Sequence, residues 1–254
     1  MNDYINVFKR TEIKYLLSGT QYTELLPFLE KYFKVDQYGK TRINNIYFDT
    51  PNFYMIRTSL EKPVYKEKLR LRTYGDTDDN TNSFIEIKKK YNGVVYKRRI
   101  SGSYIDSYNY LIKGMKPLND SQISREIENL RKTYKDLKPS MIICYDRIAM
   151  AGKSNSEQRI TFDTNISWST KPLDLRHITE GTPILKSGEV MMEIKVLNAM
   201  PMNLARKLSE LGIFPTSFSK YGKGYMDMIR KSSGTYINTY QPEELFEKGV
   251  VIYA

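Results

Sequence analysis

The chain has 254 residues, of which 40% are hydrophobic and 13% aromatic, a composition typical of a globular protein rather than a disordered one. Its formal net charge of +11 indicates a polyanionic partner, which could be nucleic acid, an anionic membrane or phosphate. Cys144 is the only cysteine and His177 the only histidine, which excludes an intrachain disulfide and argues against a Cys/His zinc site. Any metal would therefore be a hard cation held by carboxylate and phosphate oxygens.

The sequence contains no apolar run long enough for a transmembrane helix, and its N-terminus lacks the apolar core of a signal peptide. The expected location is therefore the cytoplasm. Attachment to a membrane through a separate membrane-protein partner is compatible with this expectation.

The first elements are a strand, a helix and a second strand. Alternation predicts a strand over 7–17, and helical spacing predicts a helix that Thr20 caps, with a kink or restart at Pro27. A strand over 42–48 ends in an Asp-Thr-Pro turn, and a short helix or irregular segment is expected over 52–60.

Three successive strands are predicted over 66–74, 83–90 and 94–101, with a tight hairpin at Asn92-Gly93. Side chains alternate between the two faces of a strand, so this sheet should have one polar and one apolar face. The polar face would carry Lys68, Arg70, Arg72, Glu86, Lys88, Lys90, Lys97 and Arg99. The apolar face would carry Leu69, Leu71, Ile85, Ile87, Val94 and Tyr96.

The second half of the chain continues the mixture of helices and strands. Helices are expected over 103–112 and 121–134 and from Pro201 onward, strands over 141–151, 157–163 and 190–196, and an irregular segment over 167–187. About eight strands with inserted helices predict an α+β fold built around a large antiparallel β-barrel. We found no linker, so one domain over residues 1–254 is expected.

The polar faces of these strands are strongly cationic. Their acids are Glu12, Glu86, Asp163 and Glu193, and the cations outnumber them. A solvated outer face normally mixes charges in cross-strand pairs, whereas like charges at i and i+2 on neighbouring strands repel one another unless an anion binds. This pattern favours a polar barrel interior that binds an anion over a solvated outer face. Since the cationic face lacks interleaved aromatic residues, single-stranded nucleic acid is not the expected ligand.

Several short stretches also match a known family, in that family's order along nearly the whole chain. They are Arg10-Thr11-Glu12-Ile13-Lys14-Tyr15, Tyr47-Phe48-Asp49-Thr50, Leu69-Arg70-Leu71-Arg72, Phe84-Ile85-Glu86-Ile87-Lys88, Tyr145-Asp146-Arg147, Arg159-Ile160-Thr161-Phe162-Asp163, Met192-Glu193-Ile194-Lys195 and Ser219-Lys220-Tyr221. On these residues the chain resembles the triphosphate tunnel metalloenzymes, or CYTH-like superfamily. Within that superfamily it resembles the VTC domain, a polyphosphate polymerase catalytic domain.

The resemblance implies an antiparallel barrel that forms a polar, cationic tunnel. It implies transfer of the γ-phosphoryl group from ATP, or another nucleoside triphosphate, to inorganic polyphosphate with Mn²⁺ or Mg²⁺ as cofactor. The implied catalytic residues are Lys14, Arg70, Arg72, Lys88, Arg147, Arg159 and Lys220. The implied phosphate-binding residues are Lys97, Arg99, Lys195 and Ser219, and the implied metal ligands are Glu193 and Glu12.

Two residues depart from the family pattern, and one of them, Arg10, argues against the hydrolases of the superfamily. Arg10 stands where the hydrolases of the superfamily carry an acid, and Ser217 stands where a second lysine is expected. A triphosphatase or tripolyphosphatase that uses water as acceptor is one alternative, and a non-catalytic polyphosphate- or nucleotide-binding module is another. Individual residues also have structural interpretations. Arg147 and Arg159 could pair with Asp146 or Asp163, and Glu193 could pair with Lys195.

Overall fold

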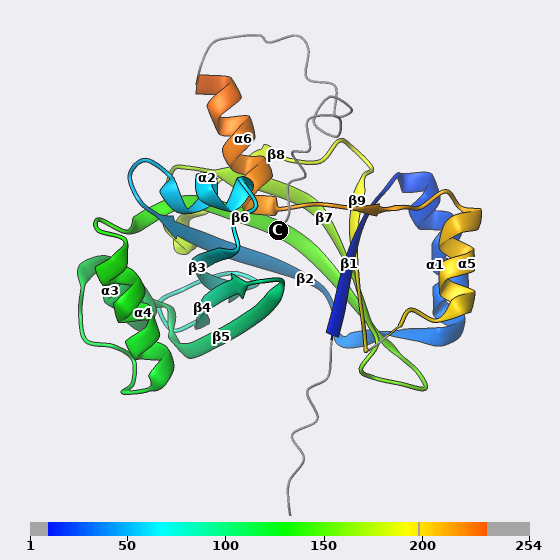
Figure 1. The fold of residues 1–254 in the computed structure, drawn as a ribbon, viewed down its shortest axis with the longest axis horizontal. Helices are drawn as coiled ribbons and strands as arrows, with labels where there is room; N and C mark the ends of the chain where they lie inside the picture. The colour runs from blue at the N-terminus through cyan, green and yellow to red at the C-terminus, as the bar shows by residue number, and fades with distance from the viewer. Residues whose placement is uncertain (1–9, 198, 233–254) are drawn as a thin grey trace, which may run out of the picture. The chain divides into compact units, whose positions relative to one another are not determined.

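The computed structural model describes residues 10–197 and 199–232, which form an antiparallel sheet of ten strands with six α-helices (Figure 1). The strands are β1 (Arg10–Leu17), β2 (Phe33–Asp49), β3 (Tyr65–Tyr74), β4 (Asn82–Tyr91), β5 (Val94–Ser103), β6 (Lys138–Gly152), β7 (Arg159–Ser169), β8 (Thr182–Pro183), β9 (Val190–Leu197) and β10 (Pro215–Thr216). The helices are α1 (Gly19–Tyr32), α2 (Tyr54–Leu60), α3 (Tyr104–Lys113), α4 (Gln122–Thr133), α5 (Met202–Glu210) and α6 (Lys220–Ser232).

The strand order is β10-β1-β9-β7-β6-β2-β3-β4-β5, with β8 paired to β7. The α+β class and the antiparallel sheet are confirmed. The sheet is nevertheless open, because no pairing among the described residues joins β10 to β5. The two edge strands are each poorly suited to further pairing. Strand β10 has only two residues, and β5 carries consecutive charges at Lys97, Arg98 and Arg99, as exposed edge strands often do.

The element boundaries show where periodicity is a weak guide. Strand β2 begins at Phe33, well before the predicted start at residue 42. Its first half was not predicted because it is polar and mostly exposed and shows no alternation. Strand β7 runs on to Ser169, into the segment expected to be irregular. Helix α1 is capped by Ser18 rather than Thr20, through a capping box with Gln21. It passes Pro27 as one helix, so the predicted restart is not observed.

The described residues divide into two compact units, and the chain passes from one to the other within β2, β6 and β7. Unit 1 comprises residues 10–41, 146–164 and 185–217, and unit 2 comprises residues 42–145, 165–184 and 218–232. The single domain expected for residues 1–254 stays a prediction.

Unit 1 has its own core between strands β1, β7 and β9 and the helices α1 and α5, which lie side by side (Figure 1). Leu17, Leu25, Phe162, Met192 and Leu204 are among its buried side chains. Strand β9 lies between β1 and β7 and pairs antiparallel with both. One face of this three-stranded group therefore lies on the core, and the alternate residues form the opposite face.

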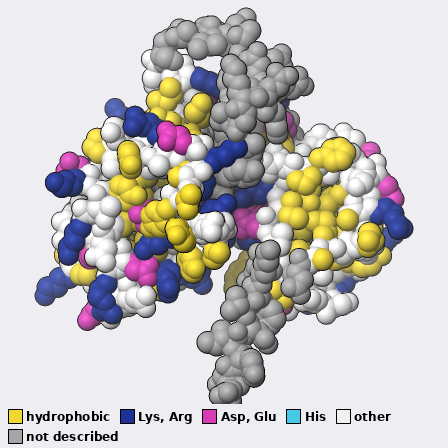
Figure 2. Space-filling model, viewed as in Figure 1, with side chains coloured by type: hydrophobic (Ala, Val, Ile, Leu, Met, Phe, Trp, Pro, Cys, Tyr) yellow, Lys and Arg dark blue, Asp and Glu magenta, His cyan; other side chains and the backbone are white. Residues whose placement is uncertain are grey.

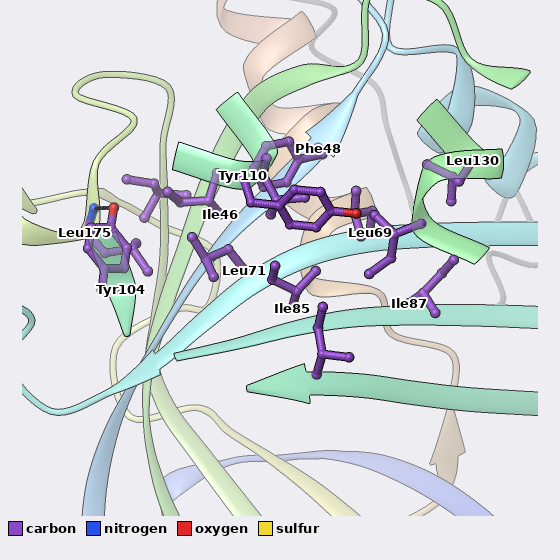
Figure 3. Close-up of a cluster of buried hydrophobic side chains, with 14 of the residues drawn as sticks. Ile46, Phe48, Leu69, Leu71, Ile85, Ile87, Tyr104, Tyr110, Leu130 and Leu175 are labelled. Carbon is purple, nitrogen blue, oxygen red and sulfur yellow. Dashed lines mark hydrogen bonds between the residues drawn. The ribbon is translucent and has the colours of Figure 1, made fainter. Parts of the chain in front are cut away.

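Unit 2 has a second core over β3, β4 and β5, covered by α3 and α4 (Figure 1). Figure 3 shows Leu69, Leu71, Ile85 and Ile87 pointing from neighbouring strands into this cluster. At its margin, the Leu175 amide donates to the Tyr104 hydroxyl at 2.9 Å (Figure 3). The predicted apolar face is thus confirmed for β3 and β4.

The prediction was wrong for the first half of β5. Val94 and Tyr96 are 54% and 51% exposed, and Ile100 is the residue of β5 that enters the core. Val94 lies opposite Tyr91, which lies opposite Tyr65, and all three are exposed. The hairpin end of these strands therefore extends past the side chains that α3 and α4 cover. Alternation alone does not show where a covering layer stops.

Candidate functional site

The polar face of unit 2 brings predicted residues into register across four strands. Tyr47 on β2 lies opposite Arg70 on β3, which lies opposite Glu86 on β4, which lies opposite Arg99 on β5. The next row along the sheet contains Lys68, Lys88 and Lys97 directly opposite one another. Like charges directly opposite each other destabilise a sheet, so this register is favourable for binding an anion.

Arg70 is held from two sides. Its Nε donates to Glu86 Oε2 at 2.6 Å, and its Nη1 donates to the Tyr47 hydroxyl at 3.1 Å. Burial lowers the pKa of Arg70, but Tyr47 and Glu86 outweigh it, so the pKa is raised and the group stays charged. A guanidinium fixed in this way presents its remaining N–H groups in a set direction, which suits phosphate oxygens.

Arg72 shares the same carboxylate. Its Nε donates to Asn45 Oδ1 at 2.9 Å and lies 3.7 Å from Glu86 Oε2. Burial raises the pKa of Glu86, but Arg70 and Arg72 outweigh it, so the pKa lies below its usual value. One ionised carboxylate thus orders two arginines.

The start of α6 carries the predicted Ser219-Lys220 pair. Ser219 Oγ accepts from the Gly222 amide at 3.1 Å and from Lys68 Nζ at 3.2 Å. Lys220 Nζ lies 4.6 Å from the centre of the Tyr145 ring, within range of a cation–π interaction. Ser219 is therefore joined to the lysine row, and both Ser219 and Lys220, the first residue of α6, contact side chains of unit 2.

Lys97 and Arg99 are on the exposed part of β5, where Arg99 Cζ lies 4.8 Å from the centre of the Phe84 ring. Figure 2 shows Lys and Arg side chains spread over the visible surface of unit 2, with Asp and Glu among them.

Unit 1 carries the other predicted residues, and here cations and acids alternate. Glu12 lies opposite Lys195 and Lys14 opposite Glu193 across β1 and β9. Lys14 Nζ lies 3.0 Å from Glu12 Oε1, and Lys195 Nζ lies 2.6 Å from Glu193 Oε1. The structural interpretation of Glu193 as a partner of Lys195 is therefore realised in this structure.

Glu193 is ionised in this setting. Burial raises its pKa, but the Lys195 and Lys14 ammonium groups outweigh burial and the nearby Glu12, so the pKa is lowered.

Thr161 lies opposite Glu193 on β7, and its Oγ1 is buried without a hydrogen-bond partner in the described structure. A buried hydroxyl with no partner is costly.

Arg147 and Arg159 also form ion pairs within unit 1. Arg147 donates to both oxygens of Asp163 at 2.6 and 2.8 Å, and Asp163 is 1% exposed. Arg159 Nη2 lies 3.3 Å from Asp36 Oδ2 and is half exposed. The pairing of Arg147 with Asp163 matches the structural alternative. The partner of Arg159 is instead Asp36, which lies in the part of β2 that the sequence did not predict.

The predicted metal ligands are the carboxylates of Glu12 and Glu193, on the neighbouring strands β1 and β9. Among the described residues, no three His, Cys, Asp or Glu side chains converge on a common point. Mg²⁺ and Mn²⁺ commonly take one or two carboxylates and complete their coordination with phosphate and water oxygens. The carboxylates of β1 and β9 fit such an ion when phosphate is also present. The side chain of Arg10, which replaces an acid of the family pattern, lies outside the described residues.

The model of one family matches residues 9–229, described as the VTC domain. The chain belongs to the VTC domain family. The match covers both units and every predicted site residue.

A relative of this VTC domain is the vacuolar transporter chaperone complex subunit 4 of Schizosaccharomyces pombe. The two are 26% identical over an alignment of 189 residues, and the match covers 63% of this chain and 26% of the relative. The chain thus spans about a quarter of the length of that relative. In the part of the chain that the structure describes, no helix combines the length and apolarity needed to cross a membrane.

A solved structure supports this fold, and a second one is similar over most of the chain. A proposed adenylate cyclase from Bacillus halodurans superposes with a TM-score of 0.50 at 13% identity, over 82% of this chain and 92% of that one. A proposed adenylyl cyclase from Hippeastrum, reported with a dominant triphosphatase activity, gives a TM-score of 0.49 at 16% identity, over 86% and 96%.

The structure also gives roles to polar residues of the VTC domain that are not among the predicted catalytic, phosphate-binding or metal-binding residues. Tyr47, Asn45 and Glu86 orient the two arginines of β3, and Tyr145 lies beneath Lys220. Tyr47 and Asn45 alternate on one face of β2, so strand periodicity could have placed them with Arg70 and Arg72. Tyr47, Tyr145 and Glu86 lie inside the stretches that matched the family, and Glu86 is also one of the acids of the predicted polar face.

Proposed function

We propose that this VTC domain is a polyphosphate polymerase that transfers the γ-phosphoryl group of ATP to the end of a phosphate or polyphosphate chain. The bond between the β- and γ-phosphates breaks, ADP leaves, and an anionic oxygen of the acceptor forms the new P–O–P bond. The acceptor oxygen is already ionised, so no general base is required. Such transfers depend mainly on positioning and on stabilising charge in the transition state.

The observation that carries the proposal is the Arg70–Arg72 pair, held by one carboxylate beside a row of three lysines. In the proposed mechanism, Arg70 and Arg72 bind non-bridging phosphate oxygens, and Lys88 and Lys220 neutralise developing charge. Lys97, Arg99 and Ser219 are the further proposed phosphate contacts of unit 2. Membership of the VTC family supports these roles, together with the registers of β3, β4 and β5.

For unit 1, we assign phosphate contacts to Lys14, Arg147, Arg159 and Lys195. These cations would exchange part of their present ion pairing for phosphate oxygens. Glu193, with Glu12, would hold Mn²⁺ or Mg²⁺, which when bound neutralises charge on phosphate oxygens. The relative's name makes it a subunit of a complex. This supports a partner protein for this chain, and a membrane protein is the partner we propose.

The test is to incubate the purified protein with ATP and Mn²⁺ and to follow ADP, free phosphate and acid-insoluble polyphosphate together. The proposal expects ADP to be matched by polymer, with both lost in Arg70→Ala and Glu193→Ala. Arg125→Ala is the matched control, because Arg125 is exposed and pairs with the exposed Asp120. ADP matched by free phosphate would instead identify a hydrolase, and binding without turnover would identify a non-catalytic module.

A further inference from the structure

Asp49, the last residue of β2, is a fully buried acid that no predicted role accounts for. Its Oδ1 accepts from the amides of Thr50 and Met55, both at 2.8 Å, and its Oδ2 accepts from the Ile56 amide at 3.0 Å. These three donors tie the end of β2 to the start of α2. Oδ2 also accepts a hydrogen bond, at 2.9 Å, from the hydroxyl of Tyr221 on α6.

Tyr221 directly follows the Ser219-Lys220 pair, so the hydrogen bond to Asp49 is made from the first turn of α6. Burial raises the pKa of Tyr221, and Asp49 raises it further, so the hydroxyl stays protonated and can donate. The ring of Tyr221 stacks on Tyr47, with 4.6 Å between centroids and 13° between planes. The hydroxyl of Tyr47 in turn accepts from Arg70. A single carboxylate is thus linked through two tyrosines to Arg70 and through the backbone to Lys220.

Close packing also restricts where α6 can lie. A Cβ on Gly224 would come within 2.8 Å of Met141 Sδ and 3.1 Å of Trp168 Cβ, so only glycine allows the helix to approach this closely. A Cβ on Gly222 would meet Leu60 Cδ2 of α2 at 3.1 Å. The glycines set the distance of α6 from its neighbours. The hydrogen bond from Tyr221 to Asp49 fixes the rotation of its first turn.

We propose that Asp49 and Tyr221 are positioning residues, which hold Ser219, Lys220 and Arg70 in the arrangement that binds phosphate. Neither touches substrate, because Asp49 is fully buried and the donors of its hydrogen bonds all belong to the protein. The inference rests on the proposed function, since it concerns the same phosphate-binding groups.

Tyr221→Phe is the sharpest test, because it removes one hydroxyl and keeps the ring that stacks on Tyr47. Tyr65→Phe is the matched control. The hydroxyl of Tyr65 also donates to a carboxylate in unit 2, that of Glu67, at 2.8 Å. This hydrogen bond involves none of the proposed phosphate-binding residues. Calorimetric titration with tripolyphosphate should show roughly tenfold weaker binding for Tyr221→Phe, as expected for a lost bond to a charged group. Tyr65→Phe should stay within about twofold of the wild type.

A double-mutant cycle with Lys220→Ala separates positioning from a general loss of stability. If Tyr221 acts through Lys220 and its neighbours, Tyr221→Phe should cost less than about threefold once Lys220 is already alanine. If Tyr221 had a purely structural role, Tyr221→Phe would lower the melting temperature of the protein. It would leave the affinity for tripolyphosphate unchanged at temperatures well below the melting temperature. That result would overturn the inference. Equal losses in both backgrounds would also overturn it.

The same titration distinguishes failure of this inference from failure of the proposed function. Wild-type protein that binds tripolyphosphate while Tyr221→Phe binds it equally well rejects the positioning role alone. Wild-type protein that does not bind tripolyphosphate rejects the proposed function, and the positioning role is rejected with it.

Discussion

Unit 1 and unit 2 are built alike but balance their charges differently. In each, paired strands bury one face and carry charged side chains on the other. In unit 1 the register sets Lys14 opposite Glu193 and Lys195 opposite Glu12, so cations and acids alternate. In unit 2, Arg70 and Arg72 share Glu86, and the neighbouring row consists of lysines. Strand alternation decides which face is polar, but register decides which charges meet.

The largest effect is expected from Arg70→Ala, because Glu86 and Tyr47 hold Arg70 from two sides within the proposed phosphate site. Loss of one preorganised group that stabilises transition-state charge typically costs on the order of 100- to 1000-fold in turnover. We expect ADP formation from ATP to fall by about this factor. Arg70→Lys should recover only part of the loss, because an ammonium cannot reproduce the planar guanidinium. A wild-type rate in Arg70→Ala would show that the ordered arginine is structural.

The next effect concerns stability in unit 1. Asp163→Asn replaces the carboxylate that accepts two hydrogen bonds from the half-buried Arg147. Breaking a buried ion pair by removing one partner is strongly destabilising. Since Arg147 is 20% exposed, we expect a loss of roughly 2–3 kcal/mol in the free energy of unfolding measured in urea. Asp120→Asn is the control, because its pair with Arg125 is exposed and should contribute less than about 0.5 kcal/mol. Equal changes in the two variants would contradict the difference we draw between the pairs.

Glu193→Gln should weaken metal binding. Titration of Mn²⁺ in the presence of tripolyphosphate, followed by the electron paramagnetic resonance signal of free Mn²⁺, should show at least roughly tenfold lower affinity. Glu210→Gln is a suitable control in unit 1, because Glu210 is 54% exposed and pairs along its helix with Lys207. Unchanged Mn²⁺ affinity would mean that Glu193 serves only Lys195 and Lys14.

The smallest effect is a pH dependence of stability. The pKa values of Glu86 and Glu193 are both lowered in the folded protein. Their stabilising contribution is therefore present above the ordinary glutamate pKa of 4.5 and is lost as the pH falls through the folded values. Urea unfolding at several pH values should show a decline below about pH 4.5 that is shallower in Glu86→Gln. An identical slope in the variant would remove Glu86 from this linkage.

Much of the fold was predictable because periodicity and punctuation are local properties. The three central strands and the helices α2, α3 and α4 lie close to their predicted positions. Elements without a local signal were missed: β8 and β10 have two residues each, and the first half of β2 is polar. The exposure of Val94 and Tyr96 could not be predicted either, because it depends on how much of the sheet α3 and α4 pack against.

The sequence by itself determined the cationic strand faces, the α+β class and the order of the family stretches, because each depends on residue type and spacing along one chain. Only the tertiary structure decided that Arg70 lies between Glu86 and Tyr47, that Arg147 pairs with Asp163, and that Asp49 receives the hydroxyl of Tyr221. These contacts join residues that are distant in the sequence. Whether two such groups meet depends on strand register and helix packing, which a one-dimensional pattern does not contain.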